Sequence, residues 1–209
     1  MYCRIIQGKL TSMKNFDKPQ DKITYPVNPL IAKRWSPRAF ENKDLPDQEL
    51  NSLWEAIRWS ASSMNAQPWQ ILFAKKGEEA HAKIVDTLMD GNKPWAANAP
   101  VLMVALAKNK FDNGKENKGA RYDLGLAIGN MSLQATDLGI ALHQMGGFFP
   151  EKVSALFNLT DNLDPVAVLA LGYYGDPESL EEPFKSREYA KRTRKEISEF
   201  VFHGELDPK

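Results

Sequence analysis

Two continuous apolar runs constrain the fold of this chain most: residues 99–107, APVLMVALA, and residues 165–174, PVAVLALGYY. A strand that is apolar at every position is typical of a sheet covered on both faces, so each run predicts a strand buried on both sides. The chain has 209 residues, of which 43% are hydrophobic. That is enough for a sizeable core, and we expect one large domain with or without extensions.

Helix and strand patterns alternate along the rest of the chain. Apolar residues at helical spacing predict helices at residues 44–63, 78–92, 120–138 and 150–158. Two more strands are predicted at residues 69–75, WQILFAK, and 140–145, IALHQM. The helix at 120–138 is the most apolar, so we expect it deep in the core or in a subunit contact. The alternating order, taken alone, favours a parallel sheet.

Charge and cysteine content exclude several classes of partner. Lys and Arg number 27, as do Asp and Glu, and no long run of one sign is present. We therefore expect neither a nucleic acid nor a membrane as partner. The single cysteine, Cys3, cannot form an internal disulfide, which favours the cytoplasm. Residues 1–25 are interpreted as a flexible arm, with Met13 as an alternative start.

The familiar catalytic motifs are missing. The sequence contains no G-x-G-x-x-G, G-x-x-x-x-G-K-[ST], H-E-x-x-H, C-x-x-C or G-x-S-x-G. The three histidines, His81, His143 and His203, stand alone, so we interpret them as buried or surface imidazoles and expect no metal site. Any difficult chemistry must then come from a cofactor.

Four segments nevertheless carry unusual chemistry. In residues 34–40, RWSPRAF, two guanidiniums and a hydroxyl either bind a phosphate or form a solvated turn. Residues 62–69, SSMNAQPW, either read a polyol or heterocycle or cap a helix and turn. The paired glycines of residues 144–149, QMGGFF, either let a planar ligand approach the backbone or make a tight turn. Residues 191–196, KRTRKE, are either a solvated turn or the other half of a phosphate clamp with Arg34.

These segments, in their order, resemble one family. RWSPRAF, SSMNAQPW, YDLGLAIGNMSLQATDLGIALHQMGGF, AVLALGYYGDP and RTRKEISEFVF together are similar to the nitroreductase family of FMN-dependent, NAD(P)H-oxidising flavoproteins. The resemblance implies an α+β fold of three layers, a mostly antiparallel central sheet flanked by helices, in one domain spanning residues 26–209. It also implies an intertwined homodimer that swaps a C-terminal extension, about residues 176–209.

The resemblance also implies roles for individual residues around FMN. Those implied for the phosphate are Arg34, Ser36, Arg192 and Arg194. Trp35 belongs to the same cofactor-binding segment, although a basic or small residue is more usual there. Arg38 is expected at the N1/O2 side of the flavin, where a cation stabilises the reduced form and raises the reduction potential.

The remaining contacts are expected from other segments. Ser62, Asn65 and Gln67 would reach the ribityl chain and ring from the second subunit. The backbone amides of Gly146 and Gly147 would point at flavin N5 and O4; many members have an acidic residue in place of Gly146. The candidate substrate contacts are Trp95 and Phe148.

The implied activity is ping-pong hydride transfer from NAD(P)H through flavin N5 to a nitroaromatic, a quinone or another small electron acceptor. No side chain need act as an acid or base. Two alternatives stay open: a flavin enzyme of different chemistry on the same fold, and a non-catalytic flavin- or ligand-binding module.

Overall fold

The computed structural model describes residues 18–206 of the chain. Its strands are β1 (Trp69–Lys75), β2 (Val101–Lys108), β3 (Ile140–Met145) and β4 (Leu163–Tyr173). Its α-helices are α1 (Pro29–Lys33), α2 (Asp47–Arg58), α3 (Glu79–Thr87), α4 (Lys93–Ala96), α5 (Ala120–Asp137), α6 (Pro150–Leu156) and α7 (Phe184–Tyr189). Within these described residues, no helix is both long and apolar enough to cross a bilayer.

The four strands form one sheet in the order β1-β2-β4-β3, and every neighbouring pair is antiparallel. The antiparallel sheet implied by the family resemblance is therefore confirmed, and the parallel arrangement suggested by the alternating order is wrong. Alternation favours a parallel sheet only when each helix carries the chain back to the same edge. Here β3 pairs with β4 at one edge, while β2 and β4 occupy the centre.

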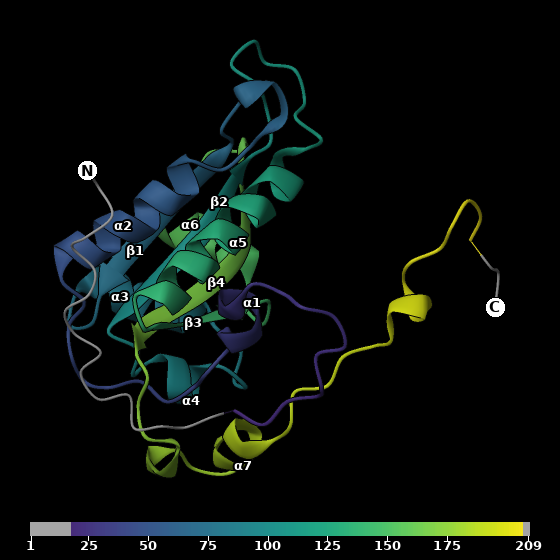
Figure 1. Cartoon of the computed structure of the whole chain (residues 1–209). Helices are drawn as coiled ribbons and strands as arrows, with labels where there is room; N and C mark the ends of the chain where they lie inside the picture. Colours follow the sequence, from purple (N-terminus) through teal and green to yellow (C-terminus); the bar gives the residue numbers. More distant parts are fainter. Residues whose placement is uncertain (1–17, 207–209) are drawn as a thin grey trace, which may run out of the picture.

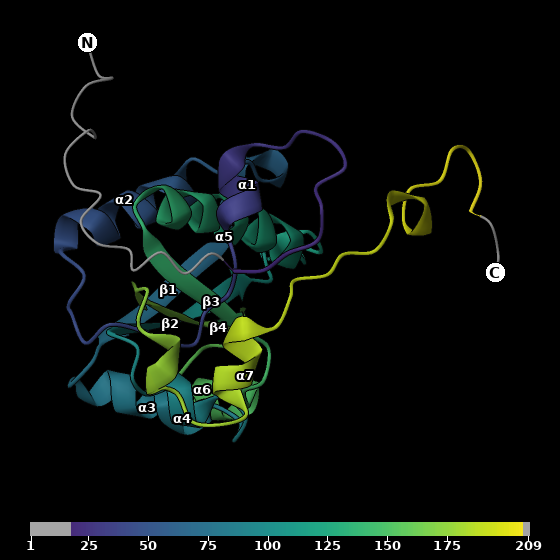
Figure 2. The ribbon, with the colours of Figure 1, turned by 60° about the horizontal axis from the view of Figure 1, so that its bottom comes forward.

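Helices cover both faces of the sheet, as Figure 2 shows, with α1, α2 and α5 on one side and α3, α4 and α6 on the other. The central strand β2 supplies both cores because successive side chains point to opposite faces. Val101, Met103 and Ala105 pack in the core with α2 and α5. Leu102 and Val104 pack in the second core with α3 and α6. The prediction of a strand buried on both faces is confirmed.

Two predicted helices are shorter than expected. The helix expected at residues 44–63 is observed as α2, which ends at Arg58, so Ala61 lies outside it and is exposed. The helix expected at 78–92 stops at Thr87 because Leu88 turns to extended geometry, with ψ of 147°, and forms a bridge with Phe148. This long-range pairing has no signal in the local apolar pattern.

The start of the described chain lies against the segment that ends at Arg192, just before the C-terminal tail leaves the body. The backbone of Arg192 forms a parallel bridge with Gln20, and Lys18 is buried. Residues 18–21, within the arm expected at residues 1–25, contact the C-terminal segment, and the boundary at residue 25 stays a prediction. Residues 1–17, including Cys3 and Met13, lie outside the described residues.

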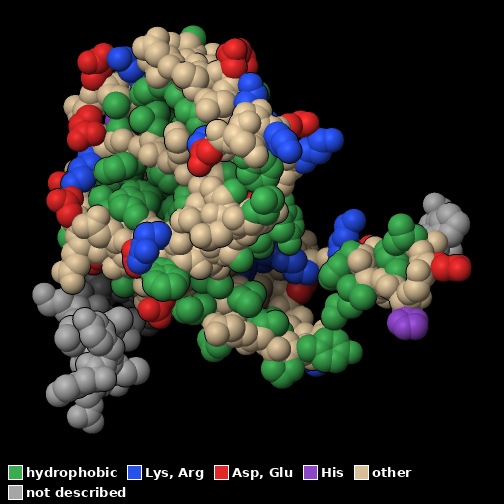
Figure 3. Space-filling model, turned by 90° about the horizontal axis from the view of Figure 1, so that it is seen from above, with side chains coloured by type: hydrophobic (Ala, Val, Ile, Leu, Met, Phe, Trp, Pro, Cys, Tyr) green, Lys and Arg blue, Asp and Glu red, His purple; other side chains and the backbone are tan. Residues whose placement is uncertain are grey.

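Beyond Arg192 the chain extends away from the rest of the molecule (Figure 1). This projecting tail, residues 193–206, displays hydrophobic side chains at a distance from the body (Figure 3). Its exposed apolar residues are Ile197, Phe200, Val201, Phe202 and Leu206. Such a segment is typical of one that covers a partner subunit, and the swapped extension stays a prediction.

Candidate functional site: an anion-binding edge

The segment RWSPRAF leads from α1 to the bridge between Phe40 and Tyr174, contacts β3 through the Pro37 carbonyl, and alternates in burial. Trp35, Pro37 and Ala39 are buried, whereas Arg34, Ser36 and Arg38 are half-exposed. In extended backbone, alternate side chains point to opposite sides. The three polar side chains therefore share the outer side, and the alternation explains how a proline-containing stretch can present two arginines and a serine together.

Arg34 and Ser36 form one polar cluster with Arg194. The Arg34 guanidinium donates to the Ser36 hydroxyl, with 3.3 Å between Nη1 and Oγ. Burial lowers the pKa of Arg34, and the positive charge of Arg194 lowers it further. The two positive charges repel each other, and an anion bound by both would offset that repulsion. We call Arg34, Ser36 and Arg194 the anion seat.

Arg192 has a different place from the one implied by the resemblance. Its guanidinium donates to the carbonyl oxygens of Arg34 at 2.6 Å and Ala32 at 2.8 Å, at the end of α1. It thereby fixes the backbone that carries the anion seat. A role as direct phosphate ligand stays a prediction for Arg192, and its observed bonds give it a supporting one.

Trp35 points away from this cluster. It is buried, and its ring lies 6.0 Å from the ring of Tyr174, with the Lys18 ammonium 5.0 Å from the indole centroid. An aromatic side chain in this position packs the segment onto the body. The structure thus favours a structural role for Trp35 over the direct cofactor contact that we expected.

Arg38 is paired with a buried carboxylate. Its backbone N–H donates to Glu188 Oε2 at 3.0 Å, and its guanidinium Nη1 lies 3.3 Å from Glu188 Oε1. The guanidinium also lies over the Trp95 ring, 5.8 Å from the centroid. These two contacts restrict the orientation of the Arg38 guanidinium.

His143, on β3, supports the segment from beneath. Its Nδ1 lies 2.8 Å from the carbonyl oxygen of Pro37, and its ring lies 4.4 Å from the ring of Trp95. Because a carbonyl can only accept, Nδ1 carries the proton. Burial lowers the pKa of His143 to about 4, and the charges of Arg38 and Arg34 act in the same direction. The imidazole is therefore neutral near pH 7 and serves as a structural donor.

The paired glycines follow β3 and are tied to the same neighbourhood. The Gly147 carbonyl accepts from the side chain of Asn92 and the backbone N–H of Met89, both at 3.0 Å. Within residues 18–206, the N–H groups of Gly146 and Gly147 donate to no protein acceptor. A Cβ at Gly146 would meet no atom within 4 Å. A Cβ at Gly147 would lie 2.8 Å from Asn92 Nδ2, so the free space is beside Gly146. Two donors along this stretch suit a ligand with acceptor atoms along one edge.

The two predicted substrate contacts lie deeper than expected. Trp95 is 1% exposed and Phe148 is 4% exposed. Trp95 stacks on Phe40 and donates from Nε1 to the Gly91 carbonyl at 3.1 Å. Their burial argues against direct contact with a substrate, and both side chains support the site from below.

The third predicted segment lies at the other end of the sheet. Ser62, Asn65 and Gln67 precede β1, whose first residue pairs with Ala107, whereas Phe40 forms a bridge with Tyr174 beyond the opposite end. The eight residues of β2 separate the two ends by roughly 20 Å. Within one chain these residues therefore lie at the opposite end of the sheet from Phe40, the last residue of the RWSPRAF segment.

The local backbone of that segment is unusual. Met64, Asn65 and Gln67 have φ values of 55°, 53° and 47°, in the left-handed region that non-glycine residues rarely occupy. The buried Asp123 of α5 holds the turn by accepting the Ser63 N–H at 3.0 Å. Backbone strain of this kind concentrates at binding sites, because the surrounding structure must maintain it.

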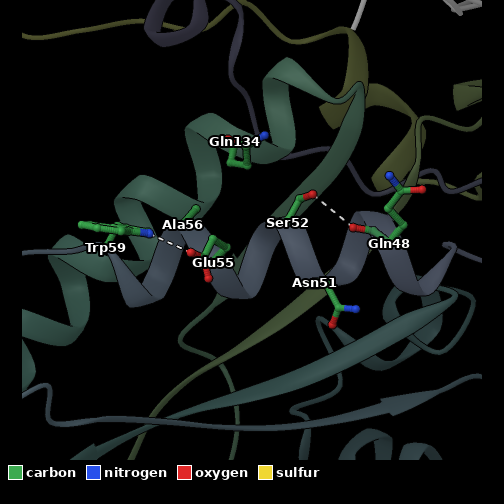
Figure 4. Close-up of a pocket in the computed structure, with 7 residues that line it drawn as sticks. All are labelled: Gln48, Asn51, Ser52, Glu55, Ala56, Trp59 and Gln134. Carbon is green, nitrogen blue, oxygen red and sulfur yellow. Dashed lines mark hydrogen bonds between the residues drawn. The ribbon is translucent and has the colours of Figure 1, made fainter. Parts of the chain in front are cut away.

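A hollow of about 850 Å³ lies elsewhere, along α2 and α5 (Figure 4). Its lining residues are Gln48, Asn51, Ser52, Glu55, Ala56, Trp59 and Gln134. None of the predicted cofactor residues lines it. The exposed indole of Trp59 donates to Glu55 Oε1 at 2.7 Å, and the hollow is a feature of the outer helical surface.

Sequence reasoning missed several supporting residues, of which Glu188 and Tyr174 matter most. Glu188 stands in a charged segment that gives no sign of burial, and only the fold brings it to Arg38. Tyr174 belongs to the predicted strand at 165–174, but nothing in its pattern places it beside Arg34. Burial raises the pKa of Tyr174, so it stays neutral next to the anion seat.

Comparisons with known proteins show which family the chain is similar to. The model of the Nitroreductase family matches residues 31–93 and 75–173. An uncharacterized 15.4 kDa protein of Mycolicibacterium smegmatis is 32% identical over 135 residues, which cover 63% of this chain and 87% of that protein. The FMN reductase (NAD(P)H) of Bacillus subtilis strain 168 is 25% identical over 158 residues, covering 66% of this chain and 62% of the reductase.

A solved structure is also similar over nearly the whole chain. It is a crystal structure described as an oxidoreductase containing FMN, 32% identical in sequence, with a TM-score of 0.84. The match covers 90% of this chain and 96% of that one.

Proposed function

Because the chain belongs to the nitroreductase family, we propose that it is an FMN-dependent oxidoreductase that oxidises NAD(P)H and passes the electrons to a small acceptor. The solved oxidoreductase that contains FMN and the FMN reductase of B. subtilis both support this cofactor, and the reductase, which uses NAD(P)H, supports this reductant. The acceptor classes we propose are nitroaromatics, quinones and activated alkenes.

The observation that carries the proposal is the anion seat. The Ser36 hydroxyl lies within hydrogen-bond distance of Arg34, and the positive charge of Arg194 is near enough to contribute to the lowered pKa of Arg34 after burial. A phosphate dianion satisfies such a group of donors by charge-assisted hydrogen bonds. These residues would hold the FMN phosphate, while Arg192 fixes the backbone beneath them.

The residues toward β3 fit the ring of the same cofactor. When bound, FMN would supply the hydride chemistry, which no side chain here provides. The open N–H groups of Gly146 and Gly147 would donate to acceptor atoms along the ring edge. Arg38 would place its charge at the other edge, where it favours the reduced, negatively charged cofactor.

A complete site would need two copies of the chain. Ser62, Asn65 and Gln67 lie at the opposite end of the sheet from Phe40 within one chain, so we propose that they reach the anion seat from a partner subunit. The outer face of α5 exposes Tyr122 and Leu126, as expected of a subunit contact. NAD(P)H and the acceptor would use the open face of the ring in turn, which predicts ping-pong kinetics.

Arg34→Ala and Arg38→Ala test the two roles separately. Arg34→Ala should weaken FMN binding about 10- to 100-fold, because a hydrogen bond to a charged group contributes about 1.5–3 kcal/mol. Arg38→Ala should mainly lower the reduction potential of the bound flavin. FMN titration and equilibrium reduction against a reference dye measure the two effects. If each substitution changed both quantities equally, this division of roles would be wrong.

A further inference from the structure

Glu188 is a buried carboxylate whose two oxygens both contact one residue, Arg38. Its side chain, near the end of α7, is 0% exposed. One oxygen accepts the backbone N–H of Arg38 at 3.0 Å, and the other lies 3.3 Å from the guanidinium of the same residue. A single side chain therefore fixes both the backbone and the side chain of Arg38.

Burying a carboxylate is costly unless cations and donors compensate it. Arg38 provides one cation, and Lys18 provides a second. The Lys18 ammonium donates to the carbonyl oxygens of Arg187, at 2.8 Å, and of Glu188. Burial lowers the pKa of Lys18, and the negative charge of Glu188 offsets part of that lowering. The N-terminal segment thus holds the end of α7 in the position that directs Glu188 at Arg38.

The pairing limits where the Arg38 charge can lie. The guanidinium is bounded by Glu188 on one side and by the Trp95 ring, and the side chain is 22% exposed. Among the described residues, Glu188 is the only carboxylate that forms an ion pair with Arg38. Without it, a long and flexible side chain would gain freedom and move its charge into water.

We propose that Glu188 is a positioning residue, which holds the Arg38 guanidinium against the flavin and thereby sets the reduction potential of the cofactor. The proposal rests on the proposed function, since it assumes that FMN lies beside Arg38. It assigns a role in tuning the cofactor to a residue outside every segment that resembles the family.

The sign of the potential change distinguishes positioning from simple charge. Glu188→Gln keeps the size of the side chain but can accept only one of the two bonds. Loss of a negative charge alone would raise the flavin potential, because a nearby cation would be less neutralised. Loss of positioning would lower it, as Arg38→Ala does, because the guanidinium leaves the ring.

The experiment measures the midpoint potential of FMN bound to four variants: Glu188→Gln, Arg38→Ala, the double variant, and Glu79→Gln as control. Glu79 is an exposed carboxylate at the start of α3 that pairs with Lys83 of the same helix, so its substitution makes the same charge change without touching Arg38 or α7. We expect a lower potential in Glu188→Gln, the same potential in the double variant as in Arg38→Ala, and no shift in the control. A raised or unchanged potential in Glu188→Gln, or a shift in the double variant beyond that of Arg38→Ala, would overturn the proposal.

Two further measurements keep the test decisive. If Glu188→Gln does not fold, Glu188→Asp retains the charge but shortens the reach by one methylene, and it should lower the potential by a smaller amount; an unchanged potential would count against positioning. Hydrogen exchange at the Arg38 amide in FMN-free protein needs no cofactor. Faster exchange in the Glu188 variant supports the contact, whereas equal rates contradict it, even if the chain were to bind no FMN and the proposed function failed.

Discussion

His143 lies under the arginine segment, where burial and the charges of Arg38 and Arg34 disfavour a protonated imidazole. Its pKa falls to about 4 from an ordinary value of 6.5, chiefly because it is buried. In the unfolded chain, His143 binds a proton as the pH falls below about 6.5, whereas in the folded chain it does so only near pH 4. Stability from this residue is fully present above pH 6.5 and is lost as the pH falls towards 4.

His143→Asn tests this at single-residue scale. Asparagine keeps a donor near the Pro37 carbonyl but does not titrate. The free energy of unfolding of the unsubstituted protein should fall by about 1.4 kcal/mol per pH unit more steeply than that of the variant between pH 6.5 and 4, or about 3 kcal/mol in all. Denaturant titrations of both proteins across this range measure the difference. His81, whose pKa burial also lowers, is present in both proteins and cancels. Parallel curves would show that His143 does not titrate as described.

At the same scale, the sequence alone could indicate Arg34, Ser36 and the glycine pair as candidate binding residues, because guanidinium, hydroxyl and exposed backbone N–H groups can bind an anion or a planar ligand. It could not indicate Glu188, because a carboxylate in a charged segment is ordinarily solvated. Nor could it show that Trp35 faces inward, since the alternation of burial in RWSPRAF depends on which side of the segment meets the sheet.

At the scale of elements, α5 shows both the strength and the limit of periodicity. The apolar pattern of residues 120–138 predicts one stripe of Leu124, Ile128, Met131, Ala135 and Leu138; the first four are buried and Leu138 is half-buried. Leu126 lies outside that stripe and is 40% exposed. Periodicity identifies the face that meets the sheet, but it cannot say whether another chain covers the outer face.

Two leucines two residues apart on α5 separate these roles. Leu124→Ala should reduce the free energy of unfolding by about 2–5 kcal/mol, because it leaves a cavity in the core. Leu126→Glu should change the stability of a single chain by less than about 0.5 kcal/mol yet dissociate the proposed dimer and release FMN. Light scattering and denaturant titration distinguish the two. A Leu126→Glu protein that stayed dimeric and kept its FMN would exclude this face from the subunit contact.

The strands were predictable because their signals are local. β1 and β3 have the bounds that were expected, and the run at 99–107 contains most of β2. The pairing order was not predictable from these patterns, since residues on separate strands meet only through the fold. The early end of α3 has the same cause: Leu88 leaves the helix to pair with Phe148, sixty residues later.

At the scale of the whole molecule, the separation of the strained turn at Met64 from Phe40, at opposite ends of the sheet, is the main reason to expect two chains in each site. Mixed dimers test this directly. A dimer of one Arg34→Ala chain and one Asn65→Ala chain would have one site with both substitutions and one with neither. When the two defective proteins are mixed and exchange subunits at random, half of the dimers are mixed and each of these has one intact site, so about a quarter of the wild-type FMN sites should return. If each site lay within one chain, mixing would restore none.

The central claim, a flavin that NAD(P)H reduces, is tested by one absorbance trace. The protein is purified, supplied with FMN, freed of unbound cofactor and mixed with NAD(P)H without oxygen. We predict one flavin per chain, bleaching of its visible band by NAD(P)H, and return of the band when a quinone or nitroaromatic is added. A protein with no flavin absorbance would contradict the assignment of the site, and a stable flavin that NAD(P)H never bleached would leave a binding module in place of an enzyme.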